Sequence, residues 1–319
     1  MLSAILTAAL VHLAANVLQA DDVSKGNPHF PASGFLPQSG SQSETPDCPL
    51  LPGCPDSPGI PLPPSTEVPG DRPAKEAADG SNLVEGSGAY SGLVLIPAGP
   101  FDMGSSEGQG RADERPEHRV FLKAFYLAKH EVTVKEYCDF LNAQGEKSRD
   151  GLPRVKLDSP FCPIEKNGRY FQPKAGEQDK PMVCVSWYGA ADYAQWAGAR
   201  LPTSAEWEKA ATLSTPYQPG DFITVPPRED RAPVSIAIPG ARGITGIVGN
   251  VWEWCADWYE DDHYVKSSAD NPAGPPLGKE KVIRGGSWAS PECSKRIKNL
   301  HRAAPAGYYR TVGFRIVKD

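Results

Sequence analysis

The stretch Val248-Gly-Asn-Val-Trp-Glu-Trp-Cys-Ala-Asp-Trp-Tyr259 decides how the rest of the chain is interpreted. Its three tryptophans and its tyrosine favour a packed setting, because large rings remove much apolar surface from water when they are buried. The two acids among them, Glu253 and Asp257, are costly to bury unless a cation or hydrogen-bond donors meet them. The stretch is therefore predicted to be a core element that also carries a polar site. The simpler alternative is an aromatic core strand whose two acids form surface salt bridges.

The composition excludes some classes of function. The 319-residue chain has a net charge of −6 at pH 7 and no long basic run, which disfavours nucleic-acid binding. Its 31 glycines and 33 prolines are typical of a protein rich in turns and irregular loops. The seven cysteines are an odd number, so in an oxidising compartment at least one must remain a thiol or pair with another molecule.

The first 90 residues divide into two segments. Residues 1–20 are mostly apolar and precede Asp21 and Asp22, which predicts a secretory signal peptide cleaved near Ala20. An uncleaved membrane anchor is the alternative, because the apolar run approaches the length that spans a bilayer. Residues 21–90 hold 13 of the 33 prolines and few large apolar residues, which predicts a disordered linker. We therefore expect export to the periplasm, the cell envelope or the medium, with tethering to a membrane or envelope as an option.

Residues 91–319 have the pattern of a folded domain. Short apolar runs predict strands near residues 93–97, 101–104, 118–128, 282–288 and 312–317. The two glycines at 285–286 predict that another part of the chain comes close to the backbone there. Helices are predicted to begin after Thr133, Ser186 and Thr203, because each of these side chains suits the N-cap position. The regions 144–180 and 213–240 are rich in charges and turns. A few helices among many short strands and long loops imply an α+β domain with much irregular structure.

Seven motifs, taken in order, resemble the sulfatase-modifying-factor domain found in formylglycine-generating enzymes. The resemblance covers roughly residues 92–317 and implies a variant C-type-lectin-like fold. The motifs are Ile96-Pro-Ala-Gly with Met103-Gly, Glu131-Val-Thr, Val185-Ser-Trp, Arg200-Leu-Pro-Thr with Glu206-Trp-Glu, Gly249-Asn-Val-Trp-Glu-Trp, Arg284-Gly-Gly-Ser-Trp and Gly313-Phe-Arg.

The same resemblance raises doubt about catalysis. Family members that make formylglycine oxidise a cysteine of a sulfatase with O2 and copper, and two cysteines three and eight residues after the Gly-Gly-Ser serine hold the copper. Those positions are Ser290 and Lys295 here, and neither a hydroxyl nor an ammonium replaces a thiolate for Cu(I). The nearby thiol is Cys293, and the residues at the family's O2 pocket, Trp252 and Ser287, are kept. Copper is therefore not expected, and Cys293, Ser290, Ser287 and Trp252 remain candidates for a reactive pocket.

The resemblance also implies a calcium site, although a weakened one. Its ligands map onto an acid of the early loop, Glu114, onto the backbone of Gly249 and Val251, and onto Glu253. Gly246 stands where the family has an asparagine, so one oxygen ligand is lost. Calcium takes about six to eight oxygens, and water can replace a missing one at some loss of affinity. The alternative is that Glu253 bonds backbone amides or an arginine.

Two further groups carry open alternatives. Cys138, Cys162 and Cys184 include either a structural disulfide or only buried thiols, and Cys48 and Cys54 form either a short disulfide loop or two thiols in the linker. A basic cluster in the last quarter of the chain is either a solvated face or the receptor of an acidic ligand. Its members are Lys295, Arg296, Lys298, His301 and Arg302.

Three functions are consistent with these features. The first is a binding or accessory module that keeps the scaffold and recognises a protein, peptide or glycan through its loops. The second is a divergent oxidoreductase of the formylglycine-generating type that acts on a cysteine or another side chain, for example in sulfatase maturation. The third is a structural envelope protein tethered through the proline-rich segment. The complete set of scaffold motifs without the thiolate pair favours the first.

Overall fold

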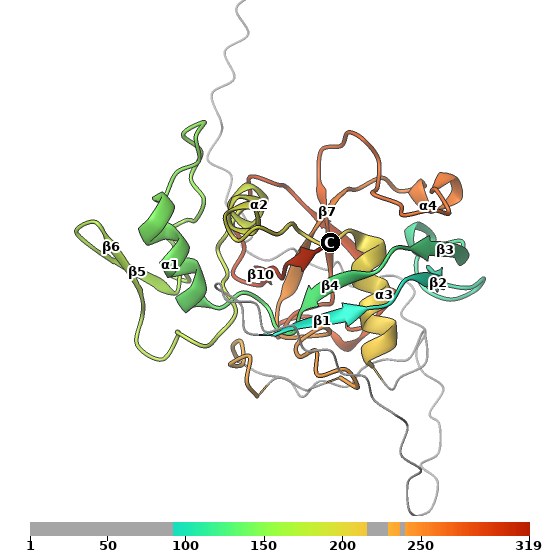
Figure 1. Cartoon of the computed structure of the whole chain (residues 1–319), viewed down its shortest axis with the longest axis horizontal. Coiled ribbons are helices and arrows are strands. Elements are labelled where there is room, and N and C mark those ends of the chain that lie inside the picture. Colours follow the sequence, from blue (N-terminus) through green and yellow to red (C-terminus); the bar gives the residue numbers. More distant parts are fainter. Residues whose placement is uncertain (1–91, 216–228, 237–239) are drawn as a thin grey trace, which may run out of the picture. The chain divides into compact units, whose positions relative to one another are not determined.

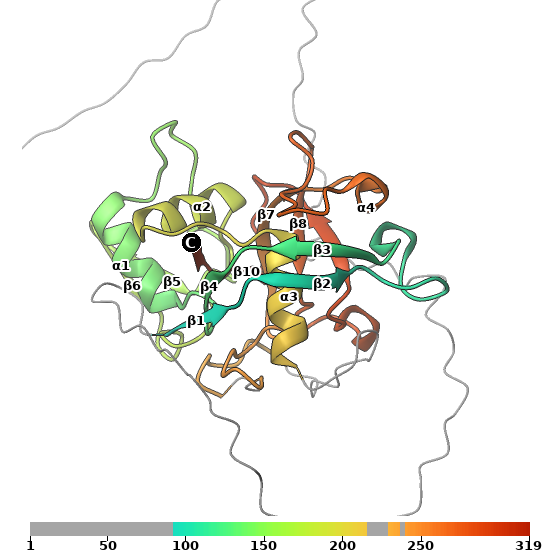
Figure 2. The same cartoon turned by 45° about the vertical axis from the view of Figure 1, so that its right-hand side comes forward.

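The aromatic stretch forms strand β7 (Trp252–Trp258), which lies inside a four-stranded sheet in the order β10–β7–β8–β9 (Figures 1 and 2). Successive side chains of a strand face opposite sides, and β7 accordingly contributes Trp252 and Trp254 to one core cluster and Cys255 to the other. Glu253 is fully buried and Asp257 is 5% exposed. The predicted core element with a polar site is thus confirmed, and surface salt bridges at these acids are excluded.

The computed structural model describes residues 92–215, 229–236 and 240–319. The predicted signal peptide (1–20), the linker (21–90) and the Cys48–Cys54 loop lie outside the described residues. Within the described part, no helix has the length and apolar character needed to cross a bilayer.

The β7 sheet is completed by three short strands. These are β8 (Lys281–Arg284), β9 (Leu300–Ala303) and β10 (Val312–Gly313). Strand β8 pairs antiparallel with β7, so that Arg284 lies opposite Glu253, and β10 pairs parallel with β7. The Gly-Gly approach after β8 is confirmed: Gly285 has φ +97°, and a Cβ there would lie 3.0 Å from both the Ile247 carbonyl oxygen and the Trp207 ring.

A second sheet has three strands in the order β1–β4–β11. They are β1 (Leu93–Ile96), β4 (Phe125–Ala128) and β11 (Val317–Lys318), all antiparallel to their neighbours. Two-stranded hairpins complete the strands. They are β2 (Gly99–Met103) with β3 (His118–Leu122), and β5 (Ile164–Asn167) with β6 (Tyr170–Pro173).

Three helices of ten or eleven residues begin where their caps predict. They are α1 (Val134–Gln144), α2 (Trp187–Trp196) and α3 (Ser204–Ser214). Thr133 and Thr203 each form a complete capping box with the glutamate three residues later, and the Ser186 side chain accepts a hydrogen bond from Gly189 N–H. One-turn elements occur in loops. They are η1 (Ala112–Glu114), α4 (His263–Lys266) and η2 (Glu292–Ser294).

Lys281, at the start of β8, links two elements through its ammonium group. The Nζ atom lies 4.0 Å from the ring centroid of Trp187 on α2 and 3.8 Å from that of Trp258 on β7. It also donates a hydrogen bond of 2.7 Å to the Ala256 carbonyl oxygen. Burial lowers the pKa of Lys281 to about 8. The two indoles and one carbonyl therefore replace the water that this cation has lost.

One expectation was wrong, and the structure adds detail to two others. The run 312–317 is not one strand: its ends pair with different sheets, and Arg315 between them turns into the interior. The charged region 144–180 contains the β5–β6 hairpin, whose Phe171 is buried. Of the two alternatives left open for the cysteines, the structure agrees with buried thiols at Cys138 and Cys162, and burial raises the pKa of Cys138 to about 12.

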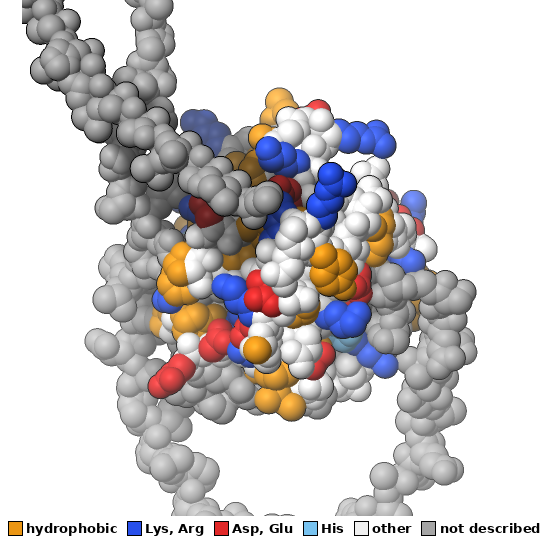
Figure 3. All heavy atoms as spheres, turned by 90° about the vertical axis from the view of Figure 1, so that its left-hand side faces the viewer, with side chains coloured by type: hydrophobic (Ala, Val, Ile, Leu, Met, Phe, Trp, Pro, Cys, Tyr) orange, Lys and Arg blue, Asp and Glu red, His pale blue; other side chains and the backbone are white. Residues whose placement is uncertain are grey.

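The side of the domain that carries α1 and the β5–β6 hairpin is chemically mixed. Figure 3 shows hydrophobic groups on this side standing between basic and acidic side chains. Tyr170 of β6 is 57% exposed, and Lys135 and Asp139 of α1 form an exposed ion pair at 2.9 Å. An α+β fold with much irregular structure is the observed architecture, as predicted.

Candidate functional site

Glu253 of β7 is the acceptor at the centre of a fully buried polar cluster. Arg315 donates from Nε to Oε2 and from Nη2 to Oε1, each at 2.7 Å, and Trp207 Nε1 donates to Oε2 at 2.8 Å. Arg315 also donates to the Ala128 and Thr245 carbonyl oxygens, which fixes the guanidinium between the sheets. A bidentate pair of this kind compensates much of the cost of burying both charges.

A second buried acid, Glu131, shares the same arginine. Its Oε2 lies 3.9 Å from Arg315 Nη2 and receives no hydrogen bond from the described residues, whereas its Oε1 accepts from Asn250 Nδ2 at 2.9 Å. Burial raises the pKa of Glu131 to about 7; Arg315 opposes this effect, and the neighbouring Glu253 adds to it. When Glu131 is ionised, two carboxylates share one guanidinium and the cluster carries a surplus of negative charge.

The backbone of the loop 246–250 comes unusually close to the Glu131 carboxylate. Asn250 has φ +56°, a conformation that Asn tolerates, and its amide reaches both Glu131 and Ala232. Gly246 has φ +66°, and a Cβ at this position would lie 2.4 Å from Glu131 Oε1. The family's asparagine position therefore directly faces the Glu131 carboxylate. The sequence already pointed to Glu131, because this residue is the first of the family-like motif Glu131-Val-Thr.

The early-loop acid assigned from the sequence, Glu114, has a different role. Arg296 Nη2 donates to its Oε1 at 2.7 Å and to its Oε2 at 2.9 Å, and Ser105 Oγ donates to Oε2 at 3.0 Å. Arg296 Nε also donates to the Cys293 carbonyl oxygen at 3.2 Å. Glu131, and not Glu114, is thus the acid that shares Arg315 with Glu253, while Glu114 supports the turn that carries Cys293.

The copper positions of the family carry a hydroxyl and a buried lysine. Ser290 Oγ lies 2.9 Å from Ser287 Oγ and accepts a hydrogen bond of 3.0 Å from Ser287 N–H. Lys295 is 3% exposed, and the half-buried Cys293 lies in η2 between the two positions. The structure therefore brings Ser287 and Ser290 together. Trp252 packs instead beside His301, with ring centroids 5.4 Å apart.

The basic cluster of the last quarter is largely interior and not a solvated face. Lys298 Nζ lies 2.9 Å from Glu208 Oε1, and Arg284 pairs with Glu208 Oε2. Burial alone would raise the pKa of Glu208, but Arg284 and Lys298 outweigh burial and hold it below its ordinary value. Arg296 is likewise bound to Glu114. Lys298, Arg284 and Arg296 therefore stabilise the fold and are not open to an acidic ligand.

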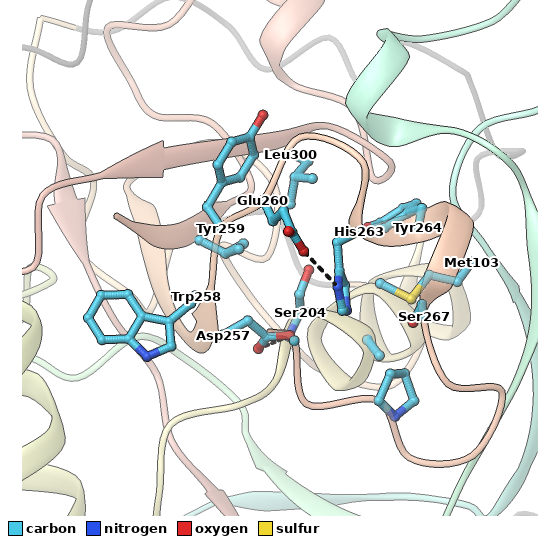
Figure 4. A pocket seen from close by; sticks show the side chains of 14 residues that line it. Met103, Ser204, Asp257, Trp258, Tyr259, Glu260, His263, Tyr264, Ser267 and Leu300 are labelled. Atoms are coloured by element: carbon cyan, nitrogen blue, oxygen red, sulfur yellow. Dashed lines mark hydrogen bonds and ion pairs between the residues drawn. The ribbon is translucent and has the colours of Figure 1, made fainter. Parts of the chain in front are cut away.

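Asp257 borders a cavity of about 20 Å³, which has room for about one water molecule (Figure 4). Its Oδ2 accepts a hydrogen bond of 2.8 Å from Ser204 N–H, and burial raises its pKa to about 6. His263 and Tyr264 also line the cavity, and His263 Nδ1 lies 3.7 Å from Glu260 Oε2. The lining surface is mostly apolar, and the small volume leaves no room for a ligand larger than water.

Comparison with known proteins gives consistent results. Residues 82–319 match the sulfatase-modifying factor enzyme 1-like domain. The formylglycine-generating enzyme of Streptomyces coelicolor is 32% identical over 72% of this chain and 89% of its own length. The serine/threonine-protein kinase Pkn1 of Chlamydia trachomatis is 38% identical over 71% of this chain, which spans only 38% of the kinase. Among solved structures, PvdO from Pseudomonas aeruginosa superposes with a TM-score of 0.58 at 28% identity, over 71% of this chain and 94% of PvdO.

Proposed function

Since the chain belongs to the sulfatase-modifying factor enzyme 1-like family, we propose that it is a binding or accessory module that keeps the family scaffold without the copper centre. One observation carries the proposal: the two copper positions hold Ser290, which is hydrogen-bonded to Ser287, and the buried Lys295. Cu(I) is a soft ion that selects thiolates, so this donor set does not fit it. The match within the longer Pkn1 kinase supports modular use of the domain.

Copper binding and oxygen consumption test the proposal. The full chain is titrated anaerobically with Cu(I) against a competing chelator, and O2 uptake is then followed with a cysteine-bearing peptide. We expect no retention of copper above the chelator and no uptake beyond the peptide-only blank. Tight stoichiometric Cu(I) binding together with peptide-dependent uptake would show that the domain is an oxidase.

A divergent oxidoreductase is the second candidate, and the half-buried Cys293, which follows the hydrogen-bonded Ser287–Ser290 pair in the sequence, favours it. If the domain is an oxidoreductase of this kind, the Cys293 thiol is essential to the oxidation that it catalyses. Replacing Cys293 by serine should then abolish any oxidation of a side chain or any metal binding that the wild-type protein has. Unchanged activity in Cys293→Ser excludes this version of the site.

A calcium ion at the Glu131–Glu253 cluster is a further part of the proposal. The Glu131 Oε2 that accepts no hydrogen bond from the described residues, and the close approach of Gly246 to this carboxylate, support it. Both carboxylates would bind the ion with backbone oxygens of Gly249 and Val251, and hard oxygen donors suit calcium. Bound calcium would stabilise the loop 246–251 and would take no part in any reaction.

The pH dependence of stability tests the calcium proposal. Glu131 has a folded pKa of about 7 against its ordinary value of 4.5, so the folded protein binds more protons than the unfolded chain between these values. Without calcium, the free energy of unfolding should therefore fall as the pH rises from about 4.5 to about 7. Calcium should remove the part of this fall that Glu131 causes in the wild type. Glu131→Gln should keep only the part due to Asp257, whose pKa burial raises to about 6, and should show no calcium response. Urea unfolding at pH 5 and pH 8, with and without calcium, measures the pH effect and the calcium effect. The exposed Glu117→Gln is the control and should behave like the wild type. If Glu131→Gln responds to calcium as strongly as Glu117→Gln does, the assignment of the site is contradicted.

Export through residues 1–20, with tethering to a membrane or envelope, is proposed together with the binding role. Its support is the apolar N-terminal run and the proline-rich segment that follows. The partner is proposed to be a protein, peptide or glycan.

A further inference from the structure

Arg310 differs from the other cations that lie over aromatic rings. Within residues 92–215, 229–236 and 240–319, six basic side chains have such a contact, and five of them also bond an acceptor. The five pairs are Arg154 with Asp192, Lys166 with Glu146, Lys281 with the Ala256 carbonyl, Arg284 with Glu208 and Arg302 with Glu280. Arg310 has no hydrogen-bond acceptor or acidic partner among the described residues.

Two rings from separate segments position the Arg310 guanidinium. Its Cζ atom lies 4.8 Å from the centroid of Phe161, in the loop before β5, and 5.3 Å from that of Trp288, directly after Ser287. The side chain of Arg310 is half-buried. A guanidinium that stacks on rings uses its faces for this contact and keeps its in-plane N–H groups for an acceptor.

The polar atoms at this place offer donors. Trp288 Nε1 is buried and donates to nothing within the described residues, and an indole N–H is a donor only. The ring of Phe161 is 39% exposed and adds apolar surface next to these donors. A ligand that fits must therefore bring an acceptor with negative charge and a short apolar stem.

We propose that Arg310, Trp288 and Phe161 form a receptor for the carboxylate of an acidic residue in a peptide segment of a partner protein. This inference rests on the binding role proposed above and names the chemistry of the ligand. A carboxylate is planar and matches the guanidinium edge in two parallel hydrogen bonds, while the methylene groups of Glu or Asp cover the Phe161 ring. The net charge of −6 disfavours non-specific binding of acidic peptides, so such binding requires a local receptor.

Binding of hexaglutamate to the full chain tests the receptor. Titration calorimetry and tryptophan fluorescence should detect binding to the wild type at low salt. Arg310→Gln should weaken it by about 10- to 100-fold, the range expected for charge-assisted hydrogen bonds. Arg310→Lys should recover only part of this loss, because an ammonium group cannot form the planar pair. Arg242→Gln removes one exposed arginine and should leave the affinity unchanged.

A second variant covers the case in which Arg310→Gln does not fold. Phe161→Leu keeps the charge but removes a stacked ring, and it should weaken binding by about 2- to 5-fold. The inference is overturned if hexaglutamate does not bind the wild type, if Arg310→Gln binds as well as Arg242→Gln, or if a sulfated heparin oligosaccharide or inorganic phosphate binds Arg310 in preference to the peptide. None of these results depends on the copper and oxygen measurements, so the two proposals fail separately.

Discussion

Replacing Arg315 by methionine is expected to lower the free energy of unfolding by about 3–5 kcal/mol, because breaking a buried ion pair leaves an uncompensated charge. The fully buried Arg315 is the cation that both Glu253 and Glu131 share. Without it, Glu253 would retain only the Trp207 N–H among the side-chain donors that now bond it. Urea unfolding at pH 8.5, above the Glu131 pKa of about 7, measures the effect.

Arg119→Met is the matched control for Arg315→Met. Arg119 pairs with Asp102 across the β2–β3 hairpin at 2.9 Å, but the two side chains are 62% and 56% exposed. Exposed pairs contribute about 0–1 kcal/mol, so this variant should unfold at nearly the wild-type urea concentration. If Arg315→Met costs no more than Arg119→Met, the buried cluster does not stabilise the fold in the way described.

Restoring two thiols at the family's copper positions is expected to restore copper binding. The double variant Ser290→Cys, Lys295→Cys should bind Cu(I) at least about 10⁴-fold more tightly than the wild type, because two thiolates replace a hydroxyl and an ammonium group. The buried state of Lys295 makes a fold check by circular dichroism necessary. Competition with a Cu(I) chelator under anaerobic conditions gives the affinities.

The single variants separate the possible ligands. Lys295→Cys and Ser290→Cys alone should each bind much more weakly than the double variant. If Ser290→Cys alone binds as tightly as the double variant, Cys293 supplies the second thiolate. Tight binding by the wild type itself would contradict the loss of the copper centre.

Local signals predicted most elements of the fold. Thr133 and Thr203 marked helix starts because a capping box needs only a four-residue pattern. The Gly285-Gly286 approach and the buried aromatic strand were equally local. The division of residues 312–318 between two sheets was missed, because it depends on strands β4 and β7, which are distant in the sequence.

The candidate site was predicted less well, because charge pairing is a property of the folded chain. Glu253 was recognised as a costly buried acid, but nothing in its neighbourhood in the sequence points to Arg315, 62 residues away. Glu114 was chosen as its partner acid, although Glu131 lies there and Glu114 bonds Arg296. Arg310 gave no signal, since its contacts with Phe161 and Trp288 join three separate loops.

The position of Arg315 between β10 and β11 has a consequence for biosynthesis. While the ribosome is still making the chain up to residue 311, β7 and β4 lack the neighbours that β10 and β11 provide. At that point the two acids of the cluster also lack the guanidinium that makes their burial tolerable. Completion of both sheets, and of the ion pairs at Arg315, must therefore follow the emergence of residues 312–318 from the ribosome.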